Sequence, residues 1–294
     1  MTVARVGIVA KRGLVAASEH VARLGAWLKE RGIEALYESD TAALAGPAAL
    51  GARTMTREEL PQEVDLVIVL GGDGTLLAMA TRIAQAGRDI PILGVNFGSL
   101  GFLTEIRIDE LTAALERVLD GTAVFDERAM LEADAYRHGK LSDSRIALND
   151  VVFTKTALSR MIELSVSVSG GFVTRVKADG LIIASATGST AYNLAAGGPI
   201  VHPGVDALVL TPIAPHTLTN RPVVIAGTAV VEVRPQVDGP AEDIFVTYDG
   251  QSGYPLHEGD LIRVRQAKQK LRLVPAPTRS YFELLREKLK WGER

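Results

Sequence analysis

The sequence predicts two consecutive domains: an N-terminal α/β domain with a parallel, Rossmann-like sheet, and a C-terminal β-sandwich domain. Three observations carry this prediction. Strand-like and helix-like segments alternate up to about residue 126, short β-branched segments follow, and helical spacing returns at the C-terminus. We therefore expect three parts, with boundaries at 1–126, 127–274 and 275–294.

In the first part, continuous apolar runs predict buried strands of a parallel sheet, and the segments between them predict covering helices. The strands are expected at residues 5–10, 34–38, 64–70 and 90–97. The first helix has one apolar face and ends before Gly32; its face consists of Ala17, Val21, Leu24 and Leu28. Two more helices are expected at 75–87 and 109–121, and residues 40–60 predict a loop with room for a short helix.

The second part consists of short segments rich in β-branched residues and separated by turn residues. The segment MIELSVSV at 161–168 alternates apolar and polar residues, as a half-buried antiparallel strand does. Together these segments predict a sandwich of antiparallel sheets. The last segment, 280–291, places Phe282, Leu285 and Leu289 on one helical face, so this face needs a groove on the first domain or on a partner subunit.

The composition excludes several classes of protein. A net charge of −3 gives no basic field for nucleic acid, and no apolar stretch reaches the length of a membrane span. There is no cysteine, hence no disulfide framework, and the first residues lack the pattern of a secretory signal. We expect a cytoplasmic, soluble protein that binds neither nucleic acid nor a membrane.

A glycine-rich turn follows the third predicted strand. The segment VDLVIVLGGDGT ends in glycines 71, 72 and 74 around Asp73, at the strand end where α/β sheets bind ligands. Glycines let backbone amides approach an anion and permit positive φ, and the next helix begins near Thr75. A carboxylate repels phosphate, so Asp73 indicates metal ligation or proton abstraction from a nearby hydroxyl. The alternative is a tight turn in which Asp73 only caps the helix.

A second patch of small residues lies at 177–203, where hydroxyl side chains precede a short helix that stops at Gly197 and Gly198. Such a segment suits a ribose or a planar ring, although close chain packing would explain the small residues equally well. Between the two patches, Asn149 and Asp150 adjoin within an apolar strand, where they need a partner such as a ribose diol or a backbone turn.

Together, the three segments resemble the NAD kinase family, which carries a GGDGT turn, an Asn-Glu or Asn-Asp pair and a glycine-rich segment in this order. Here they stand as residues 71–75, Asn149-Asp150, and ADG at 178–180 through ATGSTAY at 186–192. GGDGT alone is shared with phosphofructokinase-like and lipid kinases, whereas the three together are strongly specific.

The resemblance implies a role for each matching position. Asp73 would accept the proton of the 2′-hydroxyl on the adenosine ribose of NAD, with Gly74 beside it. Asn149 and Asp150 would bind NAD, as would Lys177, Asp179, Thr187, Thr190, Ala191, Tyr192, Asn193, Leu194 and Ala195. Arg160 and Gln251 fall where the family usually has one further polar contact. The amides at Gly71, Gly72, Gly74 and Thr75 would hold the transferred phosphoryl group.

The resemblance also implies the substrates and the assembly. We expect NAD and ATP as substrates, with polyphosphate as the alternative donor, and a homodimer or homotetramer with the NAD site near a subunit interface. No carboxylate cluster resembles a metal cage, so Mg²⁺ or Mn²⁺ is expected to arrive with ATP. Two other functions stay open: a diacylglycerol- or sphingosine-type lipid kinase, and a non-catalytic NAD-binding sensor.

Overall fold

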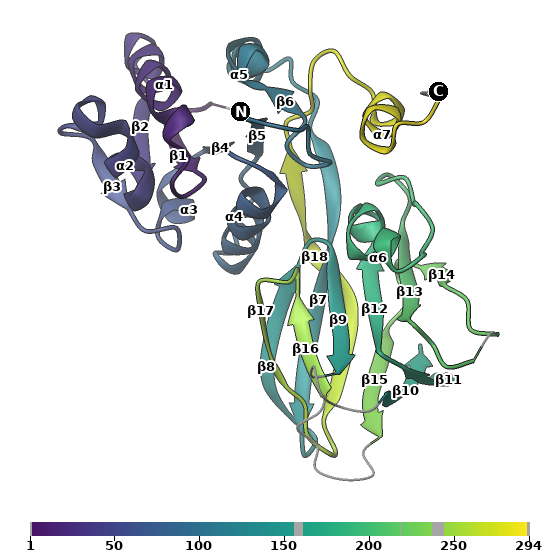
Figure 1. The fold of residues 1–294 in the computed structure, drawn as a ribbon. Helices are drawn as coiled ribbons and strands as arrows, with labels where there is room; N and C mark the ends of the chain where they lie inside the picture. Colours follow the sequence, from purple (N-terminus) through teal and green to yellow (C-terminus); the bar gives the residue numbers. More distant parts are fainter. Residues whose placement is uncertain (1, 156–160, 218, 237–243, 293–294) are drawn as a thin grey trace. The chain divides into compact units, whose positions relative to one another are not determined.

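A computed structural model describes residues 2–155, 161–217, 219–236 and 244–292 (Figure 1). The chain divides into two compact units, which are described here one at a time. The first unit contains residues 1–127 together with 271–294, and the second contains residues 128–270.

The first unit is built on a parallel sheet with the strand order β3-β2-β1-β4-β5. Each strand is a short apolar run, and β4 and β5 are buried along their whole length. A short strand, β6, and the last residue of β18 pair with β5 in the same direction. The bounds are β1 Arg5–Ala10, β2 Glu34–Glu38, β3 Arg53–Met55, β4 Leu66–Leu70, β5 Ile92–Asn96 and β6 Ile106–Arg107.

Helices cover both faces of this sheet, as the alternating sequence predicts. Helices α1 and α5 share one apolar cluster with Ile8 and Ile68, and on the opposite face Leu60 of α3 packs against Gly7 while Leu76 of α4 packs against Gly94. The bounds are α1 Ser18–Glu30, α2 Ser39–Ala45, α3 Leu60–Glu63, α4 Asp73–Gln85, α5 Leu111–Leu119 and α7 Tyr281–Leu289.

Three details of the first unit differ from the expectation. Residues 40–60 hold not only a helix but also β3, a parallel edge strand. Helix α4 begins at Asp73 instead of near Thr75. In α7 the buried residues are Leu284 and Leu285, while Phe282 is exposed. The buried face of α7 is formed by the adjacent pair Leu284 and Leu285, so the prediction that Phe282 lies on the buried face is wrong.

The second unit consists of antiparallel sheets, and the predicted fold class is confirmed. One sheet has the order β14-β13-β12-β9-β16-β17, and the other contains β11-β10-β15-β18 with β7 and β8. One core cluster takes side chains from both sheets, such as Phe153 and Ile183 from the first and Leu164 and Val233 from the second. The strands are β7 Asp126–Arg137, β8 Lys140–Ala147, β9 Asp150–Lys155, β10 Ile162–Val168, β11 Gly171–Ala178, β12 Gly180–Ser185, β13 Ala207–Ile213, β14 Val223–Ala226, β15 Val231–Gln236, β16 Ile244–Tyr248, β17 Ser252–Pro255 and β18 Leu261–Leu273.

Two short helical turns follow β12 in the second unit (Figure 1). A 3₁₀ turn spans Thr187–Thr190, and α6 spans Tyr192–Ala195 before the chain reverses at Gly197 with a φ of 83°. Among the described helices, none has both the length and the apolar character that crossing a membrane would require.

Candidate active site

The GGDGT turn lies at the carboxyl end of β4, where it leads directly into α4. Gly71 donates its N–H to Val95 O at 2.8 Å, and Gly72 is the N-cap of α4. Gly71 is required by packing, since a Cβ there would lie 3.0 Å from both Lys11 Cβ and Thr75 Oγ1. None of the three glycines has a positive φ, so the conformational freedom we expected them to supply is not used.

Gly72 and Gly74 have a different surrounding. Apart from the adjoining residues of the chain and the backbone of α4, no described heavy atom lies within 4 Å of a Cβ built at either position, so packing against the rest of the protein does not demand glycine there. Space on the Cβ side of these two residues is therefore open to a group from outside the chain. The helix dipole at the first turn of α4 favours an anion there. Two of the four N–H groups expected to hold the phosphoryl group already have acceptors in the protein, because Gly71 donates to Val95 O and Thr75 donates to Gly72 O at 3.0 Å.

Asp73 contacts a loop that follows β5. Its Oδ2 accepts the N–H of Phe102 at 2.9 Å, and its Oδ1 accepts the N–H groups of Leu103 at 3.2 Å and Thr104 at 2.9 Å. The Thr104 hydroxyl also donates to Oδ1, at 2.9 Å. These four donors compensate the negative charge and fix the orientation of the carboxylate. Because Oδ2 accepts only one of these bonds, it retains an acceptor position for a hydroxyl of another molecule.

This loop, residues 98–104, was missed by the sequence interpretation. Gly101 allows the close approach, since a Cβ there would overlap Asp73 Oδ1. Asn96 fixes both ends of the loop, accepting from Gly98 N at 2.5 Å and donating to Thr104 Oγ1 at 3.1 Å. The two glycines of GSLG, directly after a strand of the same sheet, were the available signal.

In the second unit, Asn149 and Asp150 are held by a carboxylate about a hundred positions away in the sequence. Asp249 accepts the N–H groups of Leu148 at 2.8 Å, Asn149 at 2.7 Å and Asp150 at 3.2 Å. Asp249 itself has a φ of 51°, in the left-handed region that Asp and Asn tolerate best among residues with a side chain. The sequence interpretation used the YDG turn only to locate Gln251, so the role of Asp249 was missed.

A serine hydroxyl connects the Asn149-Asp150 pair to the glycine-rich segment. Ser185 Oγ donates to Leu148 O at 2.6 Å and accepts the N–H of Gly188 at 3.0 Å. A Cβ at Gly188 would overlap the carbonyl oxygen of Asn149. The two predicted NAD-binding segments, around Asn149 and around Thr187, therefore lie side by side in this unit.

The two carboxylates of this cluster have perturbed titration. Burial and the nearby Asp249 charge raise the pKa of Asp150 to about 7. Burial also raises the pKa of Asp249, but the three backbone N–H bonds oppose that shift. Because these donors favour the charged form of Asp249, the proton is held by Asp150. A carboxyl group that titrates near neutral pH is a feature of functional sites.

The remaining predicted residues occupy three kinds of position. Asn193 is fully buried and structural, since it donates to Ser189 O and Pro199 O and accepts from Thr211 Oγ1. Tyr192 is exposed and Thr187 buried, and Thr190, Ala191, Leu194 and Ala195 lie partly or fully at the surface around them. Gln251 is exposed, and Arg160 lies outside the described residues.

Lys177 and Asp179 are separated from these residues. They precede β12, whereas Thr187 follows it, and a six-residue strand is about 20 Å long. Asp179 pairs with Lys155 at 2.8 Å at that far end. One subunit therefore does not bring Asp179 and Thr187 together around one small group.

Comparison with known proteins decides the family. Residues 6–123 match the ATP-NAD kinase N-terminal domain, and residues 148–276 match the ATP-NAD kinase C-terminal domain. The chain belongs to the NAD kinase family. The predicted site residues fall within these two matches, Asp73 in the first and Asn149 through Gln251 in the second.

Relatives of this family resemble the chain over nearly its full length. It is 49% identical to an NAD kinase of Geotalea daltonii over 91% of this chain and 92% of the relative. It is 47% identical to an NAD kinase of Syntrophotalea carbinolica over 99% of each.

Two solved structures share the fold. A yeast NADH kinase complexed with NADH has a TM-score of 0.90 at 23% identity, covering 100% of this chain and 89% of that one. An Archaeoglobus fulgidus NAD kinase in complex with ATP has a TM-score of 0.75 at 24% identity, covering 98% and 100%.

Proposed function

We propose that this chain phosphorylates the 2′-hydroxyl of the adenosine ribose of NAD, giving NADP, with ATP as phosphoryl donor. The observation that carries this proposal is Asp73 at the head of α4: a carboxylate oriented by four donors, between two glycines with open space on their Cβ side. The named relatives, all NAD kinases, support this activity over a lipid kinase or a non-catalytic NAD sensor.

The chemistry follows from this arrangement. The open space on the Cβ side of Gly72 and Gly74 suits the transferred phosphoryl group, and the positive end of the α4 dipole offsets the charge of the transition state. Asp73 Oδ2 accepts the proton of the ribose hydroxyl as the oxygen attacks the γ-phosphorus of ATP, and the bond from that phosphorus to the bridging oxygen breaks to release ADP. General-base assistance of this kind contributes roughly 10²–10⁴ in rate.

The second unit supplies the NAD-binding groups of the proposal. Asp150 accepts the hydroxyls of a ribose, while Asn149 and the segment 187–195 contact the remainder of the dinucleotide. The separation of Asp179 from Thr187 favours a homodimer or homotetramer, in which the Lys177–Asp179 segment of one subunit reaches NAD held by another. A cytoplasmic location is part of the same proposal.

The divalent cation, Mg²⁺ or Mn²⁺, is proposed to enter as part of the ATP substrate. Among the described residues, no group of three His, Cys, Asp or Glu side chains could hold a metal ion. We derive no step through a protein-bound metal.

The test is incubation of the purified protein with NAD, ATP and Mg²⁺, with NADP measured by an NADP-specific dehydrogenase. We expect NADP to form, and the Asp73→Asn variant to bind NAD but to lose at least 10²-fold in kcat, on the order of a general-base contribution. Near-normal turnover by Asp73→Asn would remove Asp73 from the role of base. Absence of NADP with every donor would contradict the proposed function itself.

A further inference from the structure

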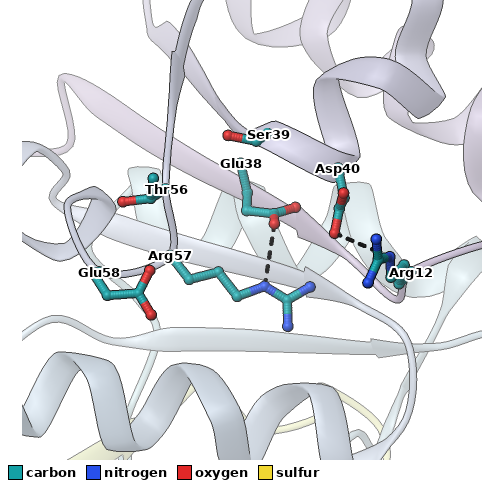
Figure 2. A pocket seen from close by; sticks show the side chains of 7 residues that line it. All are labelled: Arg12, Glu38, Ser39, Asp40, Thr56, Arg57 and Glu58. Carbon is teal, nitrogen blue, oxygen red and sulfur yellow. Dashed lines mark hydrogen bonds and ion pairs between the residues drawn. The ribbon is translucent and has the colours of Figure 1, made fainter.

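The first unit has a cavity of about 360 Å³ that no step above uses (Figure 2). Its lining comes from the carboxyl ends of three adjacent parallel strands: Arg12 after β1, residues 38–40 at the end of β2, and residues 56–58 after β3. This is the edge at which open α/β sheets bind ligands.

The side chains of the cavity are all polar, and they differ in how firmly they are held. Glu38 is buried, and its carboxylate accepts the N–H of Thr41 at 3.0 Å and Arg57 Nε at 3.3 Å. Asp40 is about half exposed and lies 3.6 Å from Arg12 Nε. Figure 2 shows these two carboxylates facing Arg57 and Arg12. The Glu38 carboxylate is thus a fixed part of the wall, whereas the Asp40 and Arg12 side chains can turn toward a ligand.

The charge of the lining limits what the cavity can bind. Each carboxylate of the lining has a guanidinium partner: Arg57 for Glu38, Arg12 for Asp40 and, at 3.0 Å, Arg82 for Glu58. Because these guanidinium groups are already paired, the lining offers no excess positive charge to a polyanion. Carboxylates accept hydrogen bonds from vicinal hydroxyls, and guanidinium groups stack on planar rings, so a nucleoside fits this chemistry. An acidic residue near the end of the second strand is also the ribose-binding feature of doubly wound sheets.

The cavity adjoins the glycine turn through β1. Strand β1 lies between β2 and β4, and Lys11 donates its backbone N–H to Leu70 O at 2.8 Å, with its Cβ against Gly71. The next residue, Arg12, lines the cavity. Two strand spacings, about 10 Å, separate β2 from β4, and a triphosphate chain can span that distance. The order of the strands reverses between β1 and β4, which makes this the switch point of the sheet.

We propose that this cavity binds the base and ribose of the phosphoryl donor, with Asp40 accepting a ribose hydroxyl and Lys11 contacting the triphosphate on its way to the glycine turn. This inference rests on the proposed function and makes it more specific. The donor is a nucleoside triphosphate, and inorganic polyphosphate, which has no nucleoside to place in the cavity, is a poor donor.

The test compares Asp40→Asn with Glu30→Gln, a matched control at the exposed C-terminal end of α1, on the opposite edge of the sheet. For Asp40→Asn we expect KM for ATP to rise about tenfold, the effect of one hydrogen bond to a charged group, with KM for NAD unchanged. The wild type should prefer ATP over its 2′- and 3′-deoxy analogues, and Asp40→Asn should lose the preference for one of them. Glu30→Gln should behave as the wild type.

Calorimetry with a non-hydrolysable ATP analogue gives a readout independent of turnover, and Arg12→Gln, whose side chain is 85% exposed, provides a second variant. Unchanged affinity of both variants for the analogue would overturn the inference, as would equal kcat/KM of the wild type with ATP and polyphosphate. NADP formation that neither variant affects would refute the cavity assignment alone. Analogue binding that Asp40→Asn weakens, in a protein that makes no NADP, would support the cavity and refute the function.

Discussion

Replacing Asp150 by asparagine should stabilise the protein above neutral pH while impairing NAD binding. In the folded protein the pKa of Asp150 is raised from 3.8 to about 7, by burial first and by the Asp249 charge second. The folded state therefore binds the Asp150 proton more tightly than the unfolded state does. The resulting stabilisation of the folded state is complete below about pH 4 and is lost as the pH rises through about 7. The amide that replaces this carboxyl group in Asp150→Asn does not titrate.

The magnitude follows from the two pKa values. Each unit of difference between the folded and unfolded pKa values of Asp150 corresponds to about 1.4 kcal/mol of stability. The difference is about three units, and roughly two of them are lost as the pH rises from 5 to 8. Over this interval, the free energy of unfolding of the wild type should fall by about 3 kcal/mol relative to that of Asp150→Asn. Urea unfolding at both pH values measures this difference.

A control and a functional readout complete the experiment. Glu258→Gln, in an exposed turn before β18, should show the same pH dependence as the wild type. KM for NAD should fall as pH rises through 7 in the wild type, because ionised Asp150 is the better acceptor for ribose hydroxyls, and should stay level in Asp150→Asn. A stability difference between Asp150→Asn and the wild type that is equal at pH 5 and pH 8 would refute the reasoning.

Two further predictions concern the positioning of these carboxylates. Gly101→Ala should lower kcat at least tenfold, because its methyl group would displace Asp73 from the loop. Gly98→Ala is the control and should be tolerated, since the nearest atom to its added Cβ lies at 3.9 Å. Steady-state kinetics at saturating substrates compares the two variants. Asp249→Asn keeps a residue that tolerates a φ of 51° but removes the charge, so it should lower the pKa of Asp150 and raise KM for NAD more than it lowers kcat. If the pH profile of KM for NAD is the same in Asp249→Asn as in the wild type, the prediction for Asp249 is wrong.

The sequence predicted what depends on local pattern. The strands with continuous apolar runs and the helices with one apolar face are found where expected, because burial of those faces decides both. Strand β3 was missed because an edge strand of three residues, with Arg53 and Thr54 exposed, has no apolar pattern. Helix α4 was placed too late because Gly74 disfavours helix in isolation, whereas here the first turn follows Gly72 as the N-cap.

In the candidate site, too, the sequence predicted the motif residues but not the distant residues that bond to them. The motif positions at Asp73, Asn149 and Asp150 could be identified from their neighbours in the sequence. Their partners could not, because the bonds from Asp73 to the 102–104 loop span about 30 positions and those from Asp249 to the 148–150 segment span about 100. Nothing in the local sequence around Asp249 specifies which amides it will accept.

Comparison of the glycines separates the requirements of packing from those of binding. Gly71, Gly101 and Gly188 each face an atom that a methyl group would crowd or overlap, so the folded chain by itself accounts for them. Gly72 and Gly74 flank Asp73, and outside their own stretch of chain no described atom lies near a would-be Cβ. A chain that gives up helix propensity at position 74 without gaining a packing contact must gain something else there. Under the proposed function, close approach of a phosphoryl group is this gain, and we expect the transfer to occur in the space beside these two glycines.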